Sequence, residues 1–329
     1  MSSLPNTRAV VLSAGFGSRL APLTDTIPKP LVPVANRPVL DLVLDRLAAS
    51  GIREVGVNLH HGAEMLSVHL ERRAQAGRLP RIRTVIEPEI LDTAGGIAHF
   101  RNWAEDEGAR GLLVHNSDIV TDLDIGALLA EHHSRGAAAT VALVDHGPTN
   151  VVSLDDDGAL VDIRGTLRRQ RCCQASCEDL LYRTFSGVYV LGRRFLPRLV
   201  AGQKASIIPA LLDAMREEPG SVRGYLPPPG TFWHDLGHVT HYLELHREIL
   251  LGGRYLPPGM DPPSTGILID PAARIEPKAA LEGFVAIGAS CHIGSDVRLF
   301  NCVVWPGTRL VDGFQAGQAV ILNDLVVAA

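Results

Sequence analysis

A loop of small residues and a lysine between two prolines stand near the N-terminus, and both suit the binding of phosphate groups. The loop contains two glycines and ends in an arginine: Ser13, Ala14, Gly15, Phe16, Gly17, Ser18 and Arg19. Small residues let backbone N–H groups approach phosphate oxygens, and the guanidinium of Arg19 adds a fixed fork of donors. Pro28 and Pro30 hold Lys29 in an extended segment, which restricts the position of its ammonium group.

This loop departs from two familiar phosphate-binding motifs. A dinucleotide fingerprint requires a third glycine where Leu20 stands, and the sequence has no Gly-Lys-Ser/Thr phosphate loop. An oxidoreductase that uses NAD is therefore disfavoured. For Lys29 taken alone, an ordinary surface loop is an equal alternative.

Two carboxylates have the chemistry to hold a hard cation. Asp118 closes a predicted apolar strand, and Asp235 stands between Trp233 and Gly237. Mg²⁺ binds few protein carboxylates and completes its shell with phosphate oxygens and water, so the pair predicts a magnesium site. A cap of a helix or turn is the alternative for each aspartate. We expect three nearby histidines to be neighbouring or surface groups rather than zinc ligands: His234, His238 and His241.

The elements that position these residues alternate between strands and helices. Apolar runs predict four buried strands: Arg8–Ser13, Glu54–Asn58, Ile82–Glu87 and Leu112–His115. Apolar periodicity predicts three helices between them: Val39–Ala49, Ala63–Arg73 and Ala94–Trp103. This alternation predicts a mostly parallel sheet flanked by helices, a Rossmann-like α/β fold, whose ligands lie at the carboxyl ends of the strands.

Beyond Ala137 the alternation loosens. Further strands are predicted at Thr140–Val144, Val151–Leu154 and Thr184–Leu191, and further helices at Ile207–Arg216 and Val239–Leu250. A segment rich in proline and glycine then reads as a linker. We therefore expect a catalytic domain over 1–254, a linker over 255–265 and a separate domain over 266–329.

The last domain contains an internal repeat of six residues. Aliphatic side chains recur at this period: Ile269, Ile275, Leu281, Ile287, Ile293 and Leu299, with Trp305 continuing the register. The segment Gly266–Leu310 resembles the hexapeptide-repeat family and predicts a short left-handed parallel β-helix. A series of amphipathic strands is the alternative. An exposed edge of such a helix would favour a homo-oligomer.

Composition limits the class of protein. The 329 residues are 46% hydrophobic, which is typical of a globular protein, and the net charge of −5 argues against a nucleic-acid partner. No apolar run is long enough to cross a bilayer and no signal peptide is evident, so we expect no membrane partner and a cytoplasmic location. The cysteine count is odd, which favours reduced thiols. Zinc is disfavoured at the cysteine cluster Cys172, Cys173 and Cys177.

The two phosphate-binding segments strongly resemble the N-terminal signature of the sugar-nucleotide pyrophosphorylases, the sugar-1-phosphate nucleotidylyltransferases. The resemblance extends over Arg8–Leu250, and several branches of that family carry the hexapeptide repeat. It implies that Arg19 and the glycine loop clamp an NTP, that Lys29 contacts phosphates, and that Asp118 and Asp235 hold Mg²⁺. It also implies a nucleotide-binding role for Glu87, Thr93 and Gly95.

On the sugar side the resemblance is less complete. It implies contacts from Asn116 and Gly187, but the family's Glu-Lys-Pro motif is absent. Because the chain has only three lysines, we expect Lys204 to take that role, with Arg164 and Arg168 as alternatives. Three stretches depart from the family pattern: Asp92 and Ser117 each replace a glycine, and Asp145–Asn150 replaces a Tyr-Gly neighbourhood, which implies an uncommon sugar.

These features predict an enzyme that joins an NTP to a sugar 1-phosphate and releases pyrophosphate. GTP with a mannose-like sugar is slightly favoured. The alternative is a catalytically inactive regulatory subunit that senses a sugar nucleotide. The presence of Arg19, Lys29, Asp118 and Asp235 together argues against that alternative, because a sensor has no need to keep all four.

Overall fold

A computed structural model describes residues 7–105, 111–167, 180–261 and 265–328. The chain divides into two compact units. The first unit takes in the chain up to Gly15, Leu47–Ile119 and Leu123–Trp233, and the second takes in Phe16–Arg46, Val120–Asp122 and His234–Ala329. The predicted domain boundaries at 254 and 266 stay a prediction.

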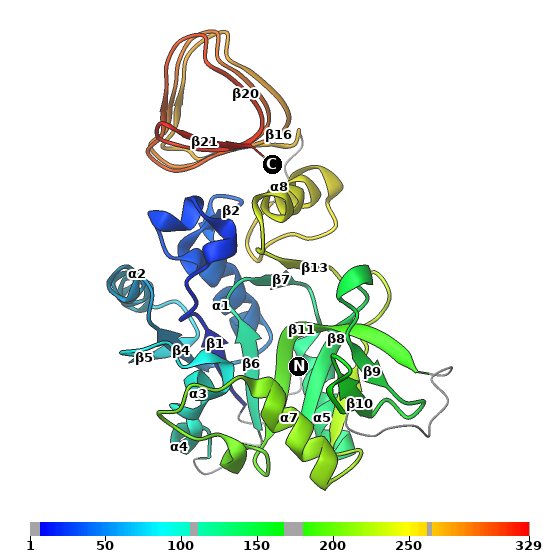
Figure 1. The fold of residues 1–329 in the computed structure, drawn as a ribbon. Helices are drawn as coiled ribbons and strands as arrows, with labels where there is room; N and C mark the ends of the chain where they lie inside the picture. The colour runs from blue at the N-terminus through cyan, green and yellow to red at the C-terminus, as the bar shows by residue number, and fades with distance from the viewer. Residues whose placement is uncertain (1–6, 106–110, 168–179, 262–264, 329) are drawn as a thin grey trace. The chain divides into compact units, whose positions relative to one another are not determined.

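The first unit contains a nine-stranded sheet, and its parallel half forms around the first strand of the chain (Figure 1). β1 (Arg8–Leu12) pairs in parallel with β4 (Glu54–Leu59) and β6 (Gly111–Asn116), and β4 pairs in parallel with β5 (Arg81–Ile86). The apolar side chains of β1 and β6 are buried, as expected for central strands covered on both faces. The predicted strands in this region are confirmed.

The other half of the sheet is mixed. β11 (Leu181–Gly192) pairs antiparallel with β6 and with β8 (Ala139–Val144). Since both partners run opposite to β11, β6 and β8 run in the same direction. The carboxyl ends of β1, β4, β5, β6 and β8 therefore lie along one edge, which we call the carboxyl edge. The remaining strands here are β9 (Val152–Leu154), β10 (Leu160–Ile163) and β12 (Val222–Tyr225).

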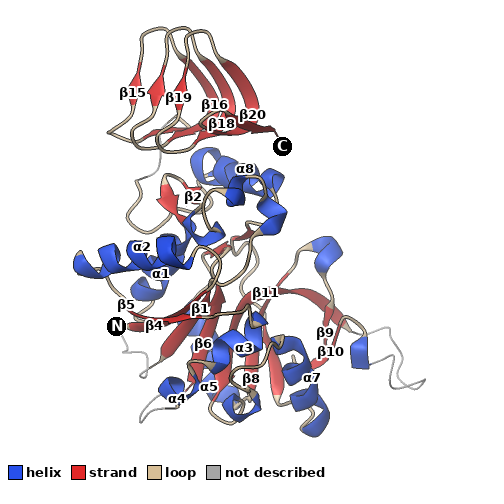
Figure 2. Ribbon diagram, turned by 60° about the vertical axis from the view of Figure 1, so that its left-hand side comes forward, coloured by secondary structure: helices blue, strands red, loops and turns tan. Residues whose placement is uncertain are grey.

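Helices surround this sheet (Figure 2). They are α2 (Ala63–Gln75), α3 (Asp92–Ala98), α4 (Arg101–Ala104), α5 (Ile125–Arg135) and α7 (Ile207–Glu217). Side chains cap two of them, since Asp124 accepts from the Ala127 N–H and Ser206 from the Ile208 N–H. The single helix predicted over Ala94–Trp103 is wrong in detail. Phe100 leaves the helical conformation there, and its fully buried ring joins the core beneath the sheet.

The second unit contains α1 (Val39–Ala49) up to Arg46, a short hairpin and α8 (Val239–Arg247). The hairpin joins β2 (Pro33–Val34) to β3 (Arg37–Pro38), with Ala35 and Asn36 in the left-handed region. The predicted helix over Val239–Leu250 is confirmed as α8, which continues as one π-helical turn. β7 (Ile119–Thr121) and β13 (Trp233–Asp235) form a two-stranded sheet, and the chain passes between the units within both.

The C-terminal part of the second unit winds in stacked, three-sided coils of parallel strands (Figure 1), here called the strand stack. One sheet of the stack consists of β14 (Ile267–Ile269), β16 (Ala280–Ile287), β18 (Arg298–Val304) and β20 (Gln315–Leu322), of which the last three run over a corner, and antiparallel β21 (Leu325–Ala328) closes it. Another consists of β15 (Arg274–Ile275), β17 (His292–Ile293) and β19 (Arg309–Leu310). Their aliphatic side chains form a separate core.

The six-residue register holds from Ile269 to Leu299 and then slips. Ile269 pairs with Ile287, but Ile287 pairs with Val304 and not with Trp305. The coil is one residue shorter at the Asn301 corner, where the strand pairing shifts its register. The prediction that Trp305 continues the repeat is therefore wrong. Instead, the buried Trp305 indole N–H donates to the Tyr242 hydroxyl of α8 at 3.0 Å.

A buried histidine joins α8 to the β2–β3 hairpin within the second unit. His246 Nδ1 lies 2.9 Å from the Tyr242 carbonyl oxygen, and its Nε2 accepts from the Ala35 N–H at 3.1 Å. The bond from Ala35 requires the neutral ring, because protonated Nε2 has no lone pair to accept with, whereas Nδ1–H donates to the Tyr242 carbonyl oxygen in either state. Burial lowers the pKa of His246 to about 4. Among the described helices none is long and apolar enough to span a membrane.

We expect stability to fall in acid through this histidine. Its folded pKa lies below its ordinary value of 6.5, so the stabilising contribution is complete above pH 6.5 and is lost as pH falls towards 4. The loss amounts to at most about 3 kcal/mol. Urea midpoints measured at pH 7.5 and 4.5 should differ less in His246→Gln than in the wild type. The half-buried His69→Gln control should keep the wild-type difference; equal pH dependence in His246→Gln would contradict the assignment.

Candidate active site

The carboxyl edge gathers the site residues that the sequence predicts within the first unit. Ser13 follows β1, Glu87 follows β5 and Asn116 ends β6, with Asp118 two residues later. The Ser117 N–H donates to the Leu12 carbonyl oxygen at 3.1 Å, which fixes the turn that carries Asp118 beside the end of β1. Asp118 is half-buried, so its carboxylate keeps some access to solvent.

A buried polar network holds three loops of this edge together. The Asn58 side chain, at the end of β4, accepts from the Ser13 N–H at 2.8 Å and donates to Glu87 Oε1 at 2.7 Å. The other carboxylate oxygen of Glu87 accepts from the Leu91 N–H at 3.0 Å. Asn58 and Glu87 are 2% and 1% exposed, so these bonds offset the cost of burying both groups.

This network changes the role we assign to Glu87. The resemblance implied that Glu87 binds the nucleotide, but both of its carboxylate oxygens bind the protein itself. Glu87 therefore positions the loop that follows β5, and its contact with a nucleotide stays a prediction. Asn58 was missed in the sequence, although its place at the end of a predicted strand was the available signal. The buried Ser13 hydroxyl has no hydrogen-bond partner among the described residues, so it is available to a ligand.

The start of α3 is held against the segment that carries Lys204. The Thr93 hydroxyl accepts from the Ile207 N–H at 2.7 Å, and the Ala94 N–H donates to the Ala205 carbonyl oxygen at 2.8 Å. A Cβ on Gly95 would lie 2.4 Å from the Gln203 carbonyl oxygen, so only glycine permits this approach. The segment containing Lys204 and the start of α3 are therefore adjacent.

The structure describes only one of the two arginines that are alternatives to Lys204 as a sugar-phosphate contact. Arg164 is exposed after β10, whereas Arg168 lies outside the described residues.

Asp92, which replaces a family glycine, adopts φ 59°, and its Oδ1 accepts from the Thr93 N–H at 2.6 Å. Aspartate is among the few residues that visit this left-handed conformation, so the departure preserves the backbone of the turn.

Gly187, in β11, lies against Asn116, which ends β6. Gly187 has φ 80°, and a Cβ there would lie 2.8 Å from Asn116 Nδ2. The pairing of β11 with β8 is also interrupted between Phe185 and Tyr189. A glycine at an interruption of strand pairing leaves the backbone without a covering side chain. The structure thus brings the predicted sugar contacts Asn116 and Gly187 together.

The second unit contains the cationic residues and the other aspartate. Arg19 Nη1 lies 3.9 Å from Asp235 Oδ2, and His241 Nδ1 lies 2.9 Å from Asp235 Oδ1. A Cβ on Gly237 would lie 2.7 Å from Asp235 Oδ2, so glycine makes room for the carboxylate. The partly exposed His241 is thus a neighbour of the predicted metal ligand, as the sequence suggested.

Of the two glycines in the N-terminal loop, the packing of the protein requires only one. Gly17 has φ 69°, and a Cβ there would lie 2.9 Å from the Cβ of Lys29, so the packing of Lys29 requires glycine. A Cβ on Gly15 would meet nothing within 4 Å, and its φ is not left-handed. The protein itself therefore leaves space over the Gly15 backbone. Phe16, between them, is 53% exposed.

The donor set suits a hard cation better than zinc. Asp118 and Asp235 are carboxylates with solvent access, which Mg²⁺ accepts together with phosphate oxygens. Within the described residues, no group of three or more His, Cys, Asp or Glu side chains is arranged to hold a metal by itself. The cluster Cys172, Cys173 and Cys177 lies outside the described residues.

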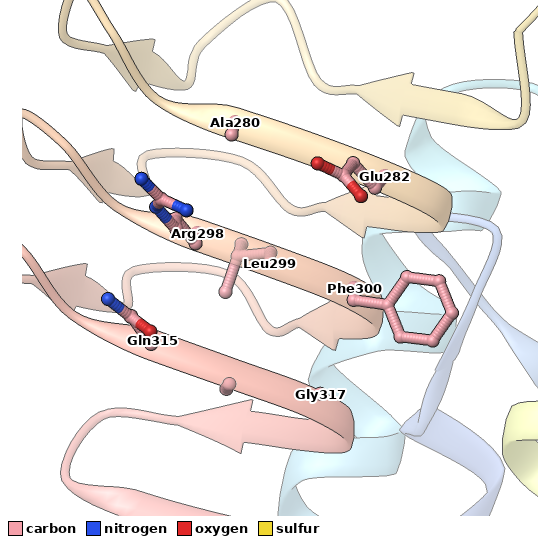
Figure 3. Close-up of a pocket in the computed structure, with 8 residues that line it drawn as sticks. Ala280, Glu282, Arg298, Leu299, Phe300, Gln315 and Gly317 are labelled. Carbon is pink, nitrogen blue, oxygen red and sulfur yellow. The ribbon is translucent and has the colours of Figure 1, made fainter.

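A separate cavity of about 450 Å³ lies on the strand stack (Figure 3). Side chains of β16, β18 and β20 line it, including Glu282, Arg298 and Phe300. It contains none of the predicted site residues.

We expect Asn58→Ala to weaken the carboxyl edge. The substitution removes the hydrogen-bond partner of the Ser13 N–H and the donor to Glu87 Oε1, which costs about 1–3 kcal/mol per group. The free energy of unfolding from urea titration should fall by that order. The exposed Asn102→Ala on α4 serves as a control and should change it by less than about 0.5 kcal/mol. A loss in Asn58→Ala no larger than in the control would refute the role of the network.

Residues 8–164 match the family model described as nucleotidyl transferase. The chain is 27% identical to mannose-1-phosphate guanylyltransferase of Mycobacterium tuberculosis, over 93% of this chain and 81% of the relative. It is 29% identical to a probable mannose-1-phosphate guanylyltransferase 2 of Arabidopsis thaliana, over 92% and 82%. It is also 26% identical to UTP–glucose-1-phosphate uridylyltransferase of Synechocystis, over 94% and 87%.

A solved structure supports the fold independently. HddC from Yersinia pseudotuberculosis, complexed with GMP-PN, superposes with a TM-score of 0.56 at 20% identity, covering 72% of this chain and 97% of that chain. The chain is thus similar, over more than nine tenths of its length, to proteins named mannose-1-phosphate guanylyltransferase and UTP–glucose-1-phosphate uridylyltransferase, and its residues 8–164 match the nucleotidyl transferase model.

Proposed function

We propose that this enzyme transfers a nucleotidyl group from an NTP to a sugar 1-phosphate and releases pyrophosphate. The observation that carries this proposal is the similarity to sugar-1-phosphate nucleotidylyltransferases along nearly the whole chain. GTP with a mannose-like sugar phosphate is our preferred pair, because two of those relatives are named mannose-1-phosphate guanylyltransferases.

The reaction requires no protein nucleophile, because the attacking group is already an anion. A phosphate oxygen of the sugar 1-phosphate attacks the α-phosphorus of the NTP, and the bond from that phosphorus to the pyrophosphate oxygen breaks. Catalysis then consists of aligning the two phosphates and balancing their charge. We assign Arg19 and Lys29 to the departing pyrophosphate, where two fixed cations favour the developing charge.

Asp118 and Asp235 would hold Mg²⁺. When bound, the ion would supply positive charge to the phosphate oxygens. The carboxylates are well suited to this, since both are half-buried and have hard oxygen donors. His241 would then orient Asp235 through the 2.9 Å contact to its Oδ1.

We assign the remaining residues by their place on the carboxyl edge. The loop Ser13, Ala14, Gly15, Phe16, Gly17 and Ser18 would bind the triphosphate, and Thr93 and Gly95 would shape the nucleotide subsite. Asn116, Gly187 and Lys204 would bind the sugar phosphate. The unpartnered Ser13 hydroxyl and the open space over Gly15 support the first assignment.

For the C-terminal part we infer a left-handed parallel β-helix that forms a homo-oligomer. The parallel pairing of successive coils and the left-handed residues at their corners support this inference. Those corner residues include Lys278, Ser290 and Asp296. A cytoplasmic location stays a prediction from the sequence. The inactive regulatory subunit is not favoured, because the similar proteins carry the names of enzymes.

The first test is pyrophosphate release from purified protein with Mg²⁺, across the five common NTPs and a panel of sugar 1-phosphates. We expect release with one preferred pair. Asp118→Asn should fold normally yet lower kcat by at least about 100-fold, because it removes a charge that acts on the transition state. The exposed Asp156→Asn is the matched control and should keep full activity. Sugar-nucleotide binding without turnover in the wild type would establish the regulatory alternative instead.

A second test uses the two glycines. Gly15→Ala meets no protein atom within 4 Å, so the melting temperature should stay within about 2 °C of the wild type. If phosphate approaches this backbone, however, the KM for the NTP should rise at least about 10-fold, which corresponds to about 1.4 kcal/mol. Gly17→Ala should lower both stability and activity, because it strains the backbone and displaces Lys29. An unchanged KM in Gly15→Ala would remove the loop from the nucleotide site.

A further inference from the structure

The cavity on the strand stack surrounds an exposed aromatic ring (Figure 3). Phe300, on β18, is 47% exposed, although burial of a phenyl ring is favourable. Figure 3 shows the face of this ring, rather than its edge, turned toward the viewer, on the same side of the strands as Glu282 and Arg298. The ring therefore offers an apolar face that a ligand can cover.

The register of the strands explains why the surface is hollow around this ring. A Cβ on Gly283 would lie 3.4 Å from the Phe300 ring, and a Cβ on Gly317 would lie 3.9 Å from it, so glycines leave the ring open on both sides. The resulting cavity of about 450 Å³ has the size of a small-ligand site, for which roughly 300–1,000 Å³ is usual. Residues of β16, β18 and β20 that pair directly form two rows across it: Ala280, Arg298 and Gln315, and Glu282, Phe300 and Gly317.

Three polar side chains line the cavity together with the ring. Among the described residues, none forms an ion pair or a hydrogen bond with the side chains of Glu282, Arg298 and Gln315. The carboxylate only accepts hydrogen bonds, the guanidinium only donates them, and the amide does both. Since the two charges are opposite, the cavity has no net charge that would select a phosphate or another ion. A ligand that satisfies all three groups has to offer both donors and acceptors.

We propose that this cavity binds a neutral sugar, with the sugar ring stacked on Phe300 and its hydroxyls bonded to Glu282, Arg298 and Gln315. The C–H face of a pyranose is apolar and packs against an aromatic ring. Each sugar hydroxyl both donates and accepts, which matches the mixed set of side chains. The cavity contains none of the residues assigned to catalysis, so this site goes beyond the proposed function and does not depend on it.

Saturation-transfer NMR on the full chain tests the site, with the methyl α-glycosides of mannose, glucose and galactose as probes. We expect one glycoside to bind the wild type and to receive the strongest transfer at the protons of its C–H face. In Phe300→Ala the Kd should rise at least about 5-fold, because the stacking surface is lost. Val311→Ala is the control, since it removes a 69% exposed apolar side chain that follows β19 outside the cavity, and it should keep the wild-type Kd.

A second readout separates a free sugar from the sugar residues of a polymer. Electrophoresis through gels that contain mannan or dextran should retard the wild type more than Phe300→Ala if the ligand is a polysaccharide. Retardation that is lost in Phe300→Ala supports the site even where no methyl glycoside binds. If Phe300→Ala does not fold, Glu282→Gln and Arg298→Gln replace it, and each should raise the Kd or reduce the retardation at least about 3-fold.

Four results would overturn the proposal. They are a wild type that binds no glycoside and no polysaccharide, sugar binding that is unchanged in Phe300→Ala, and binding of guanosine in preference to every glycoside. The fourth is a wild-type oligomer that dissociates in Phe300→Ala, measured by light scattering, because a second copy of the chain would then cover the ring. Pyrophosphate release should stay at the wild-type rate in Phe300→Ala, so a failure of this proposal leaves the proposed function untouched.

Discussion

Strand β11 runs antiparallel to both β6 and β8, and the arrangement of the candidate site follows from this constraint. Two strands that share an antiparallel neighbour run the same way, so the loops after β6 and β8 emerge at the same edge as the loops after β1, β4 and β5. Without β11 between them, the Asp118 turn and the loop after β8 would have no fixed relation. The long strand also carries Gly187 to that edge at its interruption.

Buried polar bonding gives the edge its rigidity. Asn58 and Glu87 join the loops after β1, β4 and β5 without any exposed side chain, so the ligand side of those loops stays open. Such a network stabilises only if all of its members have partners, and it therefore specifies one arrangement of the loops. Glycine at Gly95 and Gly187 has the complementary role, because it lets backbone or amide groups approach where a side chain would collide.

In the second unit, buried hydrogen bonds attach the strand stack to α8. A neutral His246 and the chain of hydrogen bonds from Trp305 through Tyr242 to the Pro33 carbonyl oxygen join α8 to both the hairpin and the strand stack. These bonds are buried, and the one that His246 Nε2 accepts is lost when the ring is protonated. The same unit carries Arg19, Lys29 and Asp235, so the anchoring of α8 also bears on the residues assigned to phosphate and metal.

The sequence alone determined the parallel half of the sheet and the extent of α1, because apolar period is a local property of the chain. Its loop motifs also predicted the family and the phosphate-binding segments. It also determined the repeat, up to the corner at Asn301. Only the tertiary structure decided that Glu87 binds protein, that Asn58 joins three loops, and that Trp305 turns to Tyr242. Each of these depends on residues far apart in sequence, whose pairing is set by strand direction and packing rather than by any local pattern.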